Sequence, residues 1–356
     1  MLMNAAAGAH LPVLKYFYVM NAVMLLLVMI LGGTVVTAKT QRRPFHPWAQ
    51  SPRSRKILII GLGLLWILDG LLQAQPLMAT QFVHELLVPL LHGQPGMVAT
   101  MMRIGMHVWR IHPLAWDLVA IWTQILLGFL ILFGEDAEWR RIGLWVSIVW
   151  GFIVWVGGEG LGSLLSGGSW FVGSPGSVLL YVLAAATLLL PRTYWSSPLL
   201  KEILRKTIAG LWFLFALLQA WPGSGWWSTP KLATDVLAQA QMAQPGFISA
   251  PLYLLAHLTR LDPLIGNGVF VALFIVLAGL WALGRPSRLT WVITSGITFG
   301  LWWCGQDLGV FGGMGTDPNS GAILLLGLMV YADLAYFQPT REPSSHHAEP
   351  GLNTSA

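Results

Sequence analysis

Charged residues are scarce in this chain of 356 residues: 10% are Asp, Glu, Lys or Arg, whereas 55% are hydrophobic. A soluble globular domain carries about 25% charged residues. The long uncharged stretches are therefore expected to lie in a lipid bilayer, with about 20 residues in each spanning helix. The net charge of +5 does not indicate a nucleic-acid partner, because the basic residues lie in short loops, where they mark membrane topology.

Cysteine is nearly absent as well. The single Cys304 excludes an internal disulfide bond and any metal or iron–sulfur site built on several cysteines. The glycine-rich stretches lack the Gly-Lys-Ser or Gly-Lys-Thr of a phosphate-binding loop. No arrangement of residues resembles a nucleophilic triad. These absences leave the catalytic residues, if there are any, unidentified by motif.

The most informative feature that is present is an internal repeat with a shift near 150 residues. Residues 94–114 align without a gap on residues 244–264, so that Gln94-Pro95-Gly96 falls on Gln244-Pro245-Gly246. Upstream, LLQAQP matches LLQAWP, and downstream, GEGLG matches GQDLG. A long-period repeat of hydrophobic units predicts a duplicated membrane bundle.

We therefore expect an all-α integral membrane protein with nine spanning helices, one leading helix and two four-helix repeats. The predicted spanning segments are 16–36, 57–77, 114–134, 141–158, 174–191, 207–222, 264–284, 288–305 and 321–338. The first segment is too long for a signal-peptide core and lacks a strongly basic leading region, so we expect it to be retained.

The predicted organisation has five parts. They are the leading helix with its basic cytoplasmic loop (1–56), repeat one (57–191), a cytoplasmic linker (192–206), repeat two (207–338) and a polar, disordered tail (339–356). Each repeat also has a long stretch between its first and second helix, 78–113 and 223–263. Apolar residues recur there every three or four positions, which predicts helices lying in the outer membrane interface.

Lysine and arginine predict the orientation. With nine helices, fifteen of the 20 lysines and arginines fall on one side, which the positive-inside rule assigns to the cytoplasm. The amino terminus is then outside a plasma (inner) membrane and the carboxyl terminus inside. Because four is an even number, both repeats enter the bilayer from the same side and are parallel, related by an axis along the membrane normal.

Few ionisable residues lie in or beside the predicted spans, and such residues carry a functional hypothesis because they are costly in a bilayer. The hypothesis is one polar pocket in the outer half of the membrane. Its predicted members are Asp69, Gln73, His107, Arg110 and Glu159. His107 and Arg110 are three residues apart and so share a helix face.

Repeat two offers a degenerate counterpart of this pocket. Phe215 replaces Asp69, and Asn267 replaces Asp117. The predicted members of the second pocket are Gln219, His257, Arg260, Gln306 and Asp307. The alternative interpretation is structural: a repeated His-x-x-Arg can pair with a carboxylate and hold an interfacial helix against the bundle.

Two glycine-rich outer loops, 157–176 and 304–321, have two readings as well. Glycine permits re-entrant backbone, which a membrane protein tolerates only against protein or a wet cavity. The same loops, with Pro175 and Asp317-Pro318, are also compatible with ordinary turns. The sequence leaves both readings open.

Cofactor candidates come from histidine and methionine. Thioethers and imidazoles on the outer face could hold copper(I), and the candidate ligands are His84, His107, Met101, Met102 and Met106. Methionine at helical spacing is also common as flexible core packing. A haem ligated by His107 and His257 is a further hypothesis.

The repeats resemble the four-helix unit of the DoxX/DoxD family of membrane proteins. The resemblance rests on GLGLLWILDGLLQAQP and ILLGFLILFGEDAEWRRIGLWVSIVWG in repeat one and on FIVLAGLWALGRPSRLTWVITSG in repeat two. Typical members have a lysine after the first helix, where this chain has Gln75 and Trp221. Members are associated with membrane redox chemistry, including thiosulfate:quinone oxidoreduction, so the resemblance implies a quinone-linked role.

Three functions remain open at the level of sequence. The first is a quinone-linked redox subunit, with the lipid bilayer and other membrane redox subunits as partners. The second is a transporter or a copper- or metal-handling permease, which Asp69 within a span favours. The third is a non-catalytic scaffold or assembly subunit of a membrane complex, in which the polar residues are structural.

Overall fold

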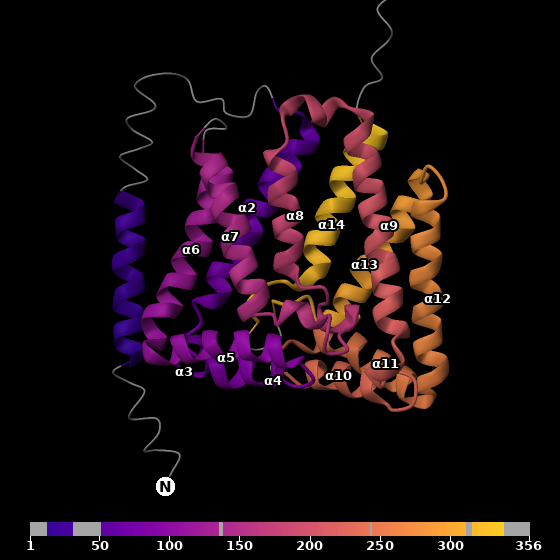
Figure 1. Ribbon diagram of the computed structural model, residues 1–356, viewed down its shortest axis with the longest axis horizontal. Coiled ribbons are helices and arrows are strands. Elements are labelled where there is room, and N and C mark those ends of the chain that lie inside the picture. The colour runs from indigo at the N-terminus through magenta and orange to yellow at the C-terminus, as the bar shows by residue number, and fades with distance from the viewer. Residues whose placement is uncertain (1–12, 31–50, 135–137, 243, 311–314, 338–356) are drawn as a thin grey trace, which may run out of the picture.

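The computed structural model describes residues 13–30, 51–134, 138–242, 244–310 and 315–337 (Figure 1). Within these ranges the regular structure is entirely helical, which confirms the predicted all-α class. Seven of the described helices are long and apolar enough to cross a membrane, so the chain is a multi-pass membrane protein. These seven are Val13–Ile30, α2 (Arg53–Gln73), α6 (Pro113–Phe133), α7 (Trp139–Gly157), α9 (Pro198–Ala220), α12 (Pro263–Ala282) and the segment Asn319–Phe337 that contains α14 (Asn319–Ala332).

Two further helices stand in the same upright bundle (Figure 1). They are α8 (Ser177–Leu189), an apolar helix of 13 residues, and α13 (Arg288–Gln306), of 19 residues. Each of the nine predicted segments therefore contains a helix. The end of the first segment, beyond Ile30, and the predicted tail 339–356 lie outside the described residues.

The start of α9 differs from the prediction. We expected a linker over 192–206 and a helix from 207, whereas α9 begins at Pro198, after a short 3-10 turn at Arg192–Ser196. Charged residues mark where the chain leaves the apolar core of the bilayer. The helix itself can continue through them, because lysine, arginine and glutamate are good helix formers. Glu202 and Arg205, one turn apart, form an ion pair of 2.6 Å that stabilises this polar first part of α9.

Shorter helices lie across one end of the upright bundle (Figure 1). They are α3 (Met78–Gln81), α4 (Val88–Leu90), α5 (Gly96–Ile111), α10 (Lys231–Ala240) and α11 (Gly246–Leu261), with a π-helical turn at Phe82–Leu87. They occupy the two long stretches for which the sequence predicts interfacial helices. Their amphipathic pattern explains the placement, because α5 buries Val98, Met102 and Met106 against the bundle and exposes its other faces.

The helices pack in the same pairs in each half of the chain, taking 53–191 as the first half and 192–337 as the second. In the first half α2 packs on α6 and α7 on α8, and in the second half α9 packs on α12 and α13 on α14. Trp66 on α2 and Trp212 on α9 are each fully buried. The halves meet through α14, which packs on both α2 and α8 and adds Ile323 to the core of the first half.

The contact between α2 and α6 depends on two glycines. A Cβ on Gly128 would lie 2.5 Å from the carbonyl oxygen of Gly63, and a Cβ on Gly63 would lie 2.5 Å from Leu132. Small residues at such crossings let two backbones approach, which is the usual basis of helix packing in membranes. The close approach brings Asp69 and Gln73 of α2 next to α6.

We predict that Gly128→Ala destabilises the protein by about 1–3 kcal/mol, because overpacking a tight contact has this typical cost. Gly279→Ala on α12 is the matched control, since a Cβ there would have no neighbour within 4 Å. Thermal melting of the purified protein in detergent, followed by size-exclusion chromatography, measures both. Equal melting of Gly128→Ala and the unmodified protein would contradict the packing argument.

Candidate functional site

A cavity of about 500 Å³ lies in the first half, beside the interfacial helices. Most of its wall is apolar or aromatic, with four tryptophans, Trp66, Trp109, Trp116 and Trp150. Its ionisable residues are Asp69, Glu85, Glu159 and Asp317, and its amide side chains are Gln73, Gln124 and Asn319. We call this space the acidic cavity. It brings together three of the five predicted pocket residues, Asp69, Gln73 and Glu159.

Asp69 lies at the inner wall of the acidic cavity and is 2% exposed. The hydroxyl of Tyr181 on α8 donates a hydrogen bond to its Oδ1 at 3.3 Å. Tyr181 in turn packs edge-on against Trp66, with 5.1 Å between the ring centroids. A carboxyl in a bilayer span needs such a donor, because its removal from water is costly. Asp69 is thus both held in place and open to the cavity.

Gln73, one turn after Asp69, links α2 to α6. Its Nε2 donates to Oδ1 of Asp117 at 2.7 Å, and Asp117 is fully buried. The second half has the same link, because Nε2 of Gln219 donates to Oδ1 of Asn267 at 2.6 Å. An amide oxygen therefore serves as well as a carboxylate oxygen at this position.

Glu159 follows the end of α7 and is held by the start of α8. The hydroxyl of Ser177 donates to its Oε1 at 2.9 Å, and the backbone N–H of Val178 lies 3.4 Å from the same oxygen. Its other oxygen, Oε2, is buried and has no hydrogen-bond partner among the residues that the structure describes. This unpartnered oxygen belongs to a residue that lines the acidic cavity.

Asp317 reaches the acidic cavity from the second half of the chain, and the sequence did not identify it. Its Oδ1 accepts from the backbone N–H of Asn319 at 2.7 Å, and its Oδ2 accepts from the hydroxyl of Thr316 at 3.2 Å. Its carboxyl also shares Ser177 with Glu159. The Asp-Pro pair in a glycine-rich loop signalled a turn, but nothing local indicates which half of the molecule that turn contacts.

The proximity of Glu159 and Asp317 controls their charge. Burial, and then the charge of Asp317, raise the pKa of Glu159 to about 8, and burial raises the pKa of Asp317 as well. Two carboxyls in one poorly solvated place do not ionise independently, because each charge opposes the other. Near neutral pH the pair therefore holds a proton that it can donate or take back.

The first glycine-rich loop, residues 157–176, belongs to the first half and contacts the second half. Trp170, from a 3-10 turn (Trp170–Val172), packs on Phe215 of α9 with 4.6 Å between centroids. Its carbonyl oxygen accepts from Nε2 of Gln306 on α13 at 2.5 Å. Phe215 stands where the first half has Asp69. In the second half, buried aromatic rings therefore fill the place that corresponds to the acidic cavity.

His107 and Arg110 do not line the acidic cavity, contrary to the prediction. Both lie on the exposed face of α5, whose opposite face is buried. Their spacing does put them on one face, as predicted. The helix turns that face outward because its apolar residues, among them Met102 and Met106, are the ones that pack on the bundle.

The predicted second pocket is not assembled either. Gln219, Gln306 and Asp307 are buried, whereas His257 and Arg260 are exposed on α11. The side chain of Gln219 is hydrogen-bonded to Ser169 and Asn267. The side chain of Gln306 is hydrogen-bonded to the carbonyl oxygen of Trp170 and to Ser320. Burial raises the pKa of Asp307 to about 6.

The predicted copper ligands are divided between two faces. His84, His107 and Met101 are exposed, whereas Met102 and Met106 are buried. Among the described residues, no three His, Cys, Asp or Glu side chains group as metal ligands. The paired histidines of the haem hypothesis, His107 and His257, each face the exterior of the protein rather than a common interior.

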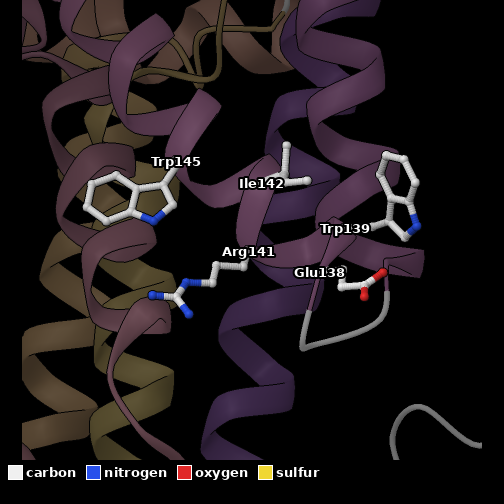
Figure 2. A pocket seen from close by; sticks show the side chains of 5 residues that line it. All are labelled: Glu138, Trp139, Arg141, Ile142 and Trp145. Atoms are coloured by element: carbon white, nitrogen blue, oxygen red, sulfur yellow. The ribbon is translucent and has the colours of Figure 1, made fainter.

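A second hollow, of about 430 Å³, lies at the start of α7. Figure 2 shows that Glu138 and Arg141 point to opposite sides of it, and that Trp139 and Trp145 also diverge. All five residues that line it belong to one short segment, Glu138 to Trp145. Without converging polar groups it offers no binding site.

Comparison with known proteins gives no match: no protein family, curated protein or solved structure is similar to this chain. The acidic cavity is therefore interpreted from its own chemistry.

We predict that Asp117→Asn leaves the melting temperature close to that of the unmodified protein, because Asn267 accepts the equivalent bond in the second half. Asp117→Leu leaves the amide of Gln73 without its partner, at a cost of about 1–3 kcal/mol. Asn267→Leu is the matched control and should cost a similar amount. If Asp117→Asn were as damaging as Asp117→Leu, the link would require a carboxyl group.

We also predict that stability falls as the pH rises from about 5 to about 8. The pKa of Glu159 is raised from an ordinary value of 4.5 to about 8, so the folded chain binds this proton more tightly than the unfolded chain. Below pH 4.5, Glu159 is protonated in both the folded and the unfolded state, and its full contribution to stability is present. Between pH 4.5 and 8 the carboxyl ionises in the unfolded state but not in the folded state, which lowers the free energy of unfolding. Above pH 8 this contribution of Glu159 has been lost completely. The shift at Asp317 acts in the same direction.

Glu159→Gln tests this pH dependence directly. Gln306 occupies the equivalent position: its Oε1 accepts from the backbone N–H of Gly321, as Oε1 of Glu159 does from Val178, and its Nε2 donates to the hydroxyl of Ser320. The variant should therefore fold, and its melting temperature should fall less between pH 5 and 8 than that of the unmodified protein. Glu138→Gln, at an exposed carboxyl, is the control. An unchanged pH profile in Glu159→Gln would rule out Glu159 as the source.

Proposed function

We propose that the acidic cavity binds the head group of a membrane quinone, and that this chain is the quinone-binding subunit of a membrane redox complex. The observation that carries the proposal is the meeting of Asp69, Glu159 and Asp317 inside an aromatic, mostly apolar wall. Pockets for small molecules generally combine such a wall with a few converging polar groups.

The chemistry of a quinone fits this set of side chains. A flat ring can stack on tryptophan, and a protonated carboxyl donates to a quinone carbonyl oxygen. The hydroxyl groups of the quinol can donate to a carboxylate, for which Oε2 of Glu159 has no other partner among the described residues. Oxidation of a quinol releases two protons and two electrons. The carboxyls would receive protons, and the electrons would pass to a redox centre of a partner subunit.

The route of entry also suits a lipid-soluble ligand. Val108, Trp116 and Ile153 line the acidic cavity and are 39–58% exposed on the surface of the bundle. They come from α5, α6 and α7, so the opening lies between an interfacial helix and two upright helices. A quinone could enter there from the bilayer without crossing water. The resemblance to the DoxX/DoxD family implies the same quinone-linked role.

We further propose nine spanning helices in two parallel repeats. Matched contacts in the two halves support the repeats: Nε1 of Trp155 donates to the carbonyl oxygen of Pro175 at 2.9 Å, and Nε1 of Trp302 donates to that of Pro318 at 2.7 Å. Residues 160–162 and 307–309 also share the left-handed backbone conformation, with φ between 54° and 67°.

The orientation belongs to the same proposal. The positive-inside rule places the amino terminus outside a plasma (inner) membrane and the carboxyl terminus in the cytoplasm. The interfacial helices and the acidic cavity then lie on the outer side. Protons released from a bound quinol would leave on that side, close to the Glu159 and Asp317 pair.

The acidity of the cavity favours a second candidate, a permease for cations. Its lining has four carboxyl side chains, and the lining contains no lysine, arginine or histidine. Tryptophan faces attract organic cations, which adds to the charge attraction. In this case the Glu159 and Asp317 pair would exchange a proton for the cation.

We predict saturable binding of a short-chain ubiquinone analogue to the purified protein in nanodiscs, followed by quenching of tryptophan fluorescence. The double variant Asp69→Leu and Glu159→Leu should weaken binding about tenfold, because it removes two hydrogen-bond donors, each worth about 0.5–1.5 kcal/mol. Asp307→Asn removes a buried carboxyl from the second half, away from the cavity lining, and should bind like the unmodified protein.

Three outcomes separate the candidates. Saturable binding that only the cavity variant weakens supports the quinone. Absence of saturable quenching, or equal weakening by Asp307→Asn, contradicts it. Binding of tetraphenylphosphonium in place of the quinone, lost in the cavity variant, would favour the permease.

A further inference from the structure

The interfacial helices carry basic side chains that do not line the acidic cavity. On α5 these are Arg103, His107 and Arg110, and on α11 they are His257 and Arg260. All five are exposed. The side chains of these five residues form no hydrogen bond or ion pair with the part of the chain that the structure describes. Basic side chains on the outward face of a membrane-surface helix, with no partner in the described chain, are free to bind an anionic group from outside it.

An exposed apolar stripe runs beside the cations on each helix. On α5 it consists of Met97, Met101, Ile104, Val108 and Ile111, and on α11 of Phe247, Leu254, Leu258 and Leu261. The intervals of three, four and seven residues keep each stripe on one side of its helix. An apolar stripe next to a cationic one is the pattern of a helix whose apolar side meets acyl chains and whose cations meet head groups.

The spacing within each pair fits one phosphate group. Residues three apart on a helix have Cβ atoms about 5–6 Å apart, so His107 with Arg110, and His257 with Arg260, can donate to the same phosphate. Both helices lie at the same end of the bundle (Figure 1). The α5 pair has no acidic residue on its own helix, whereas Arg260 is followed at two residues by the exposed Asp262, whose Oδ1 accepts from the N–H of Ile265.

We infer that each repeated His-x-x-Arg pair binds the phosphate of an anionic phospholipid, giving two head-group sites for each chain. Charge complementarity and the acyl-chain contact of the neighbouring stripe identify the occupant. The α5 site is the stronger one, because its own helix carries no carboxylate. This inference does not depend on the quinone proposal, since the α11 site lies in the half without the cavity.

The α5 site also adjoins the acidic cavity. Gly105, Val108 and Trp109 of the same helix belong to the cavity wall. A lipid bound at His107 and Arg110 would therefore stabilise that wall from outside. The α11 site has no such neighbour, so the two sites can be told apart by their effect on the cavity.

Native mass spectrometry of the full chain in neutral detergent tests the inference, with phosphatidylglycerol and phosphatidylcholine as probes. We expect two tightly retained phosphatidylglycerol molecules and no comparable retention of phosphatidylcholine. His107→Gln with Arg110→Gln should leave one, as should His257→Gln with Arg260→Gln, and the combined variant none. Loss of an arginine should weaken binding about fivefold at each site.

Two control variants make the result decisive. Lysine at both positions of the α5 pair keeps a basic hydrogen-bond donor at each position and should keep the lipid, which separates loss of the basic groups from misfolding. Arg141→Gln with Arg285→Gln removes two exposed cations elsewhere on the chain. Unchanged retention in the combined variant, or an equal loss in the Arg141 and Arg285 variant, would overturn the inference. Quinone-analogue binding that survives in the α11 variant shows that the two proposals fail or stand separately.

Discussion

Each of the two glycine-rich loops contacts the opposite half of the chain, and the rest of this structure depends on this exchange of loops. Irregular backbone cannot face lipid, so its polar groups must be satisfied by protein. Here much of that protein belongs to the opposite half: Gln306 donates to the carbonyl oxygen of Trp170, and Gln75 donates to that of Gly315 at 3.1 Å. The exchange delivers Trp170 to the second half and Asp317 to the first, and each arrival determines what the interior of that half can hold.

The two halves show how one backbone plan can hold different chemistry. Where Asp69 meets Tyr181, the acidic cavity remains; where Phe215 takes the same place, Trp170 packs against it and the space is filled. Glu159 accepts from the backbone N–H of Val178 as Gln306 accepts from that of Gly321, yet only Glu159 can change its charge. The hydrogen-bond framework was thus kept in both halves, while the ionisable groups were kept in one.

The lengths of the apolar runs predicted where the helices lie, because each run must match the thickness of a bilayer. They did not predict that α9 begins at Pro198, since the lysines and arginines at its start lie outside the apolar run but are still part of the helix. Periodicity placed His107 and Arg110 on a common face, but only tertiary packing decides which face turns inward. Asp317 could not be found at all from local pattern, because the destination of its loop is set by the opposite half. Intramembrane cost did identify Asp69 and, beside it, Gln73 and Glu159.

The origin of Asp317 has a consequence for how the acidic cavity works. Its carboxyl shares Ser177 with Glu159, and Ser177 opens α8, one of the two first-half helices on which α14 packs. The proton held by Glu159 and Asp317 is therefore shared across the interface between the halves. Burial is the largest cause of the raised pKa of both carboxyls, so this proton depends on the packing of α14 against α8, which keeps water away from the pair. The charge state of the cavity is therefore a property of both halves together, which the first half alone could not have.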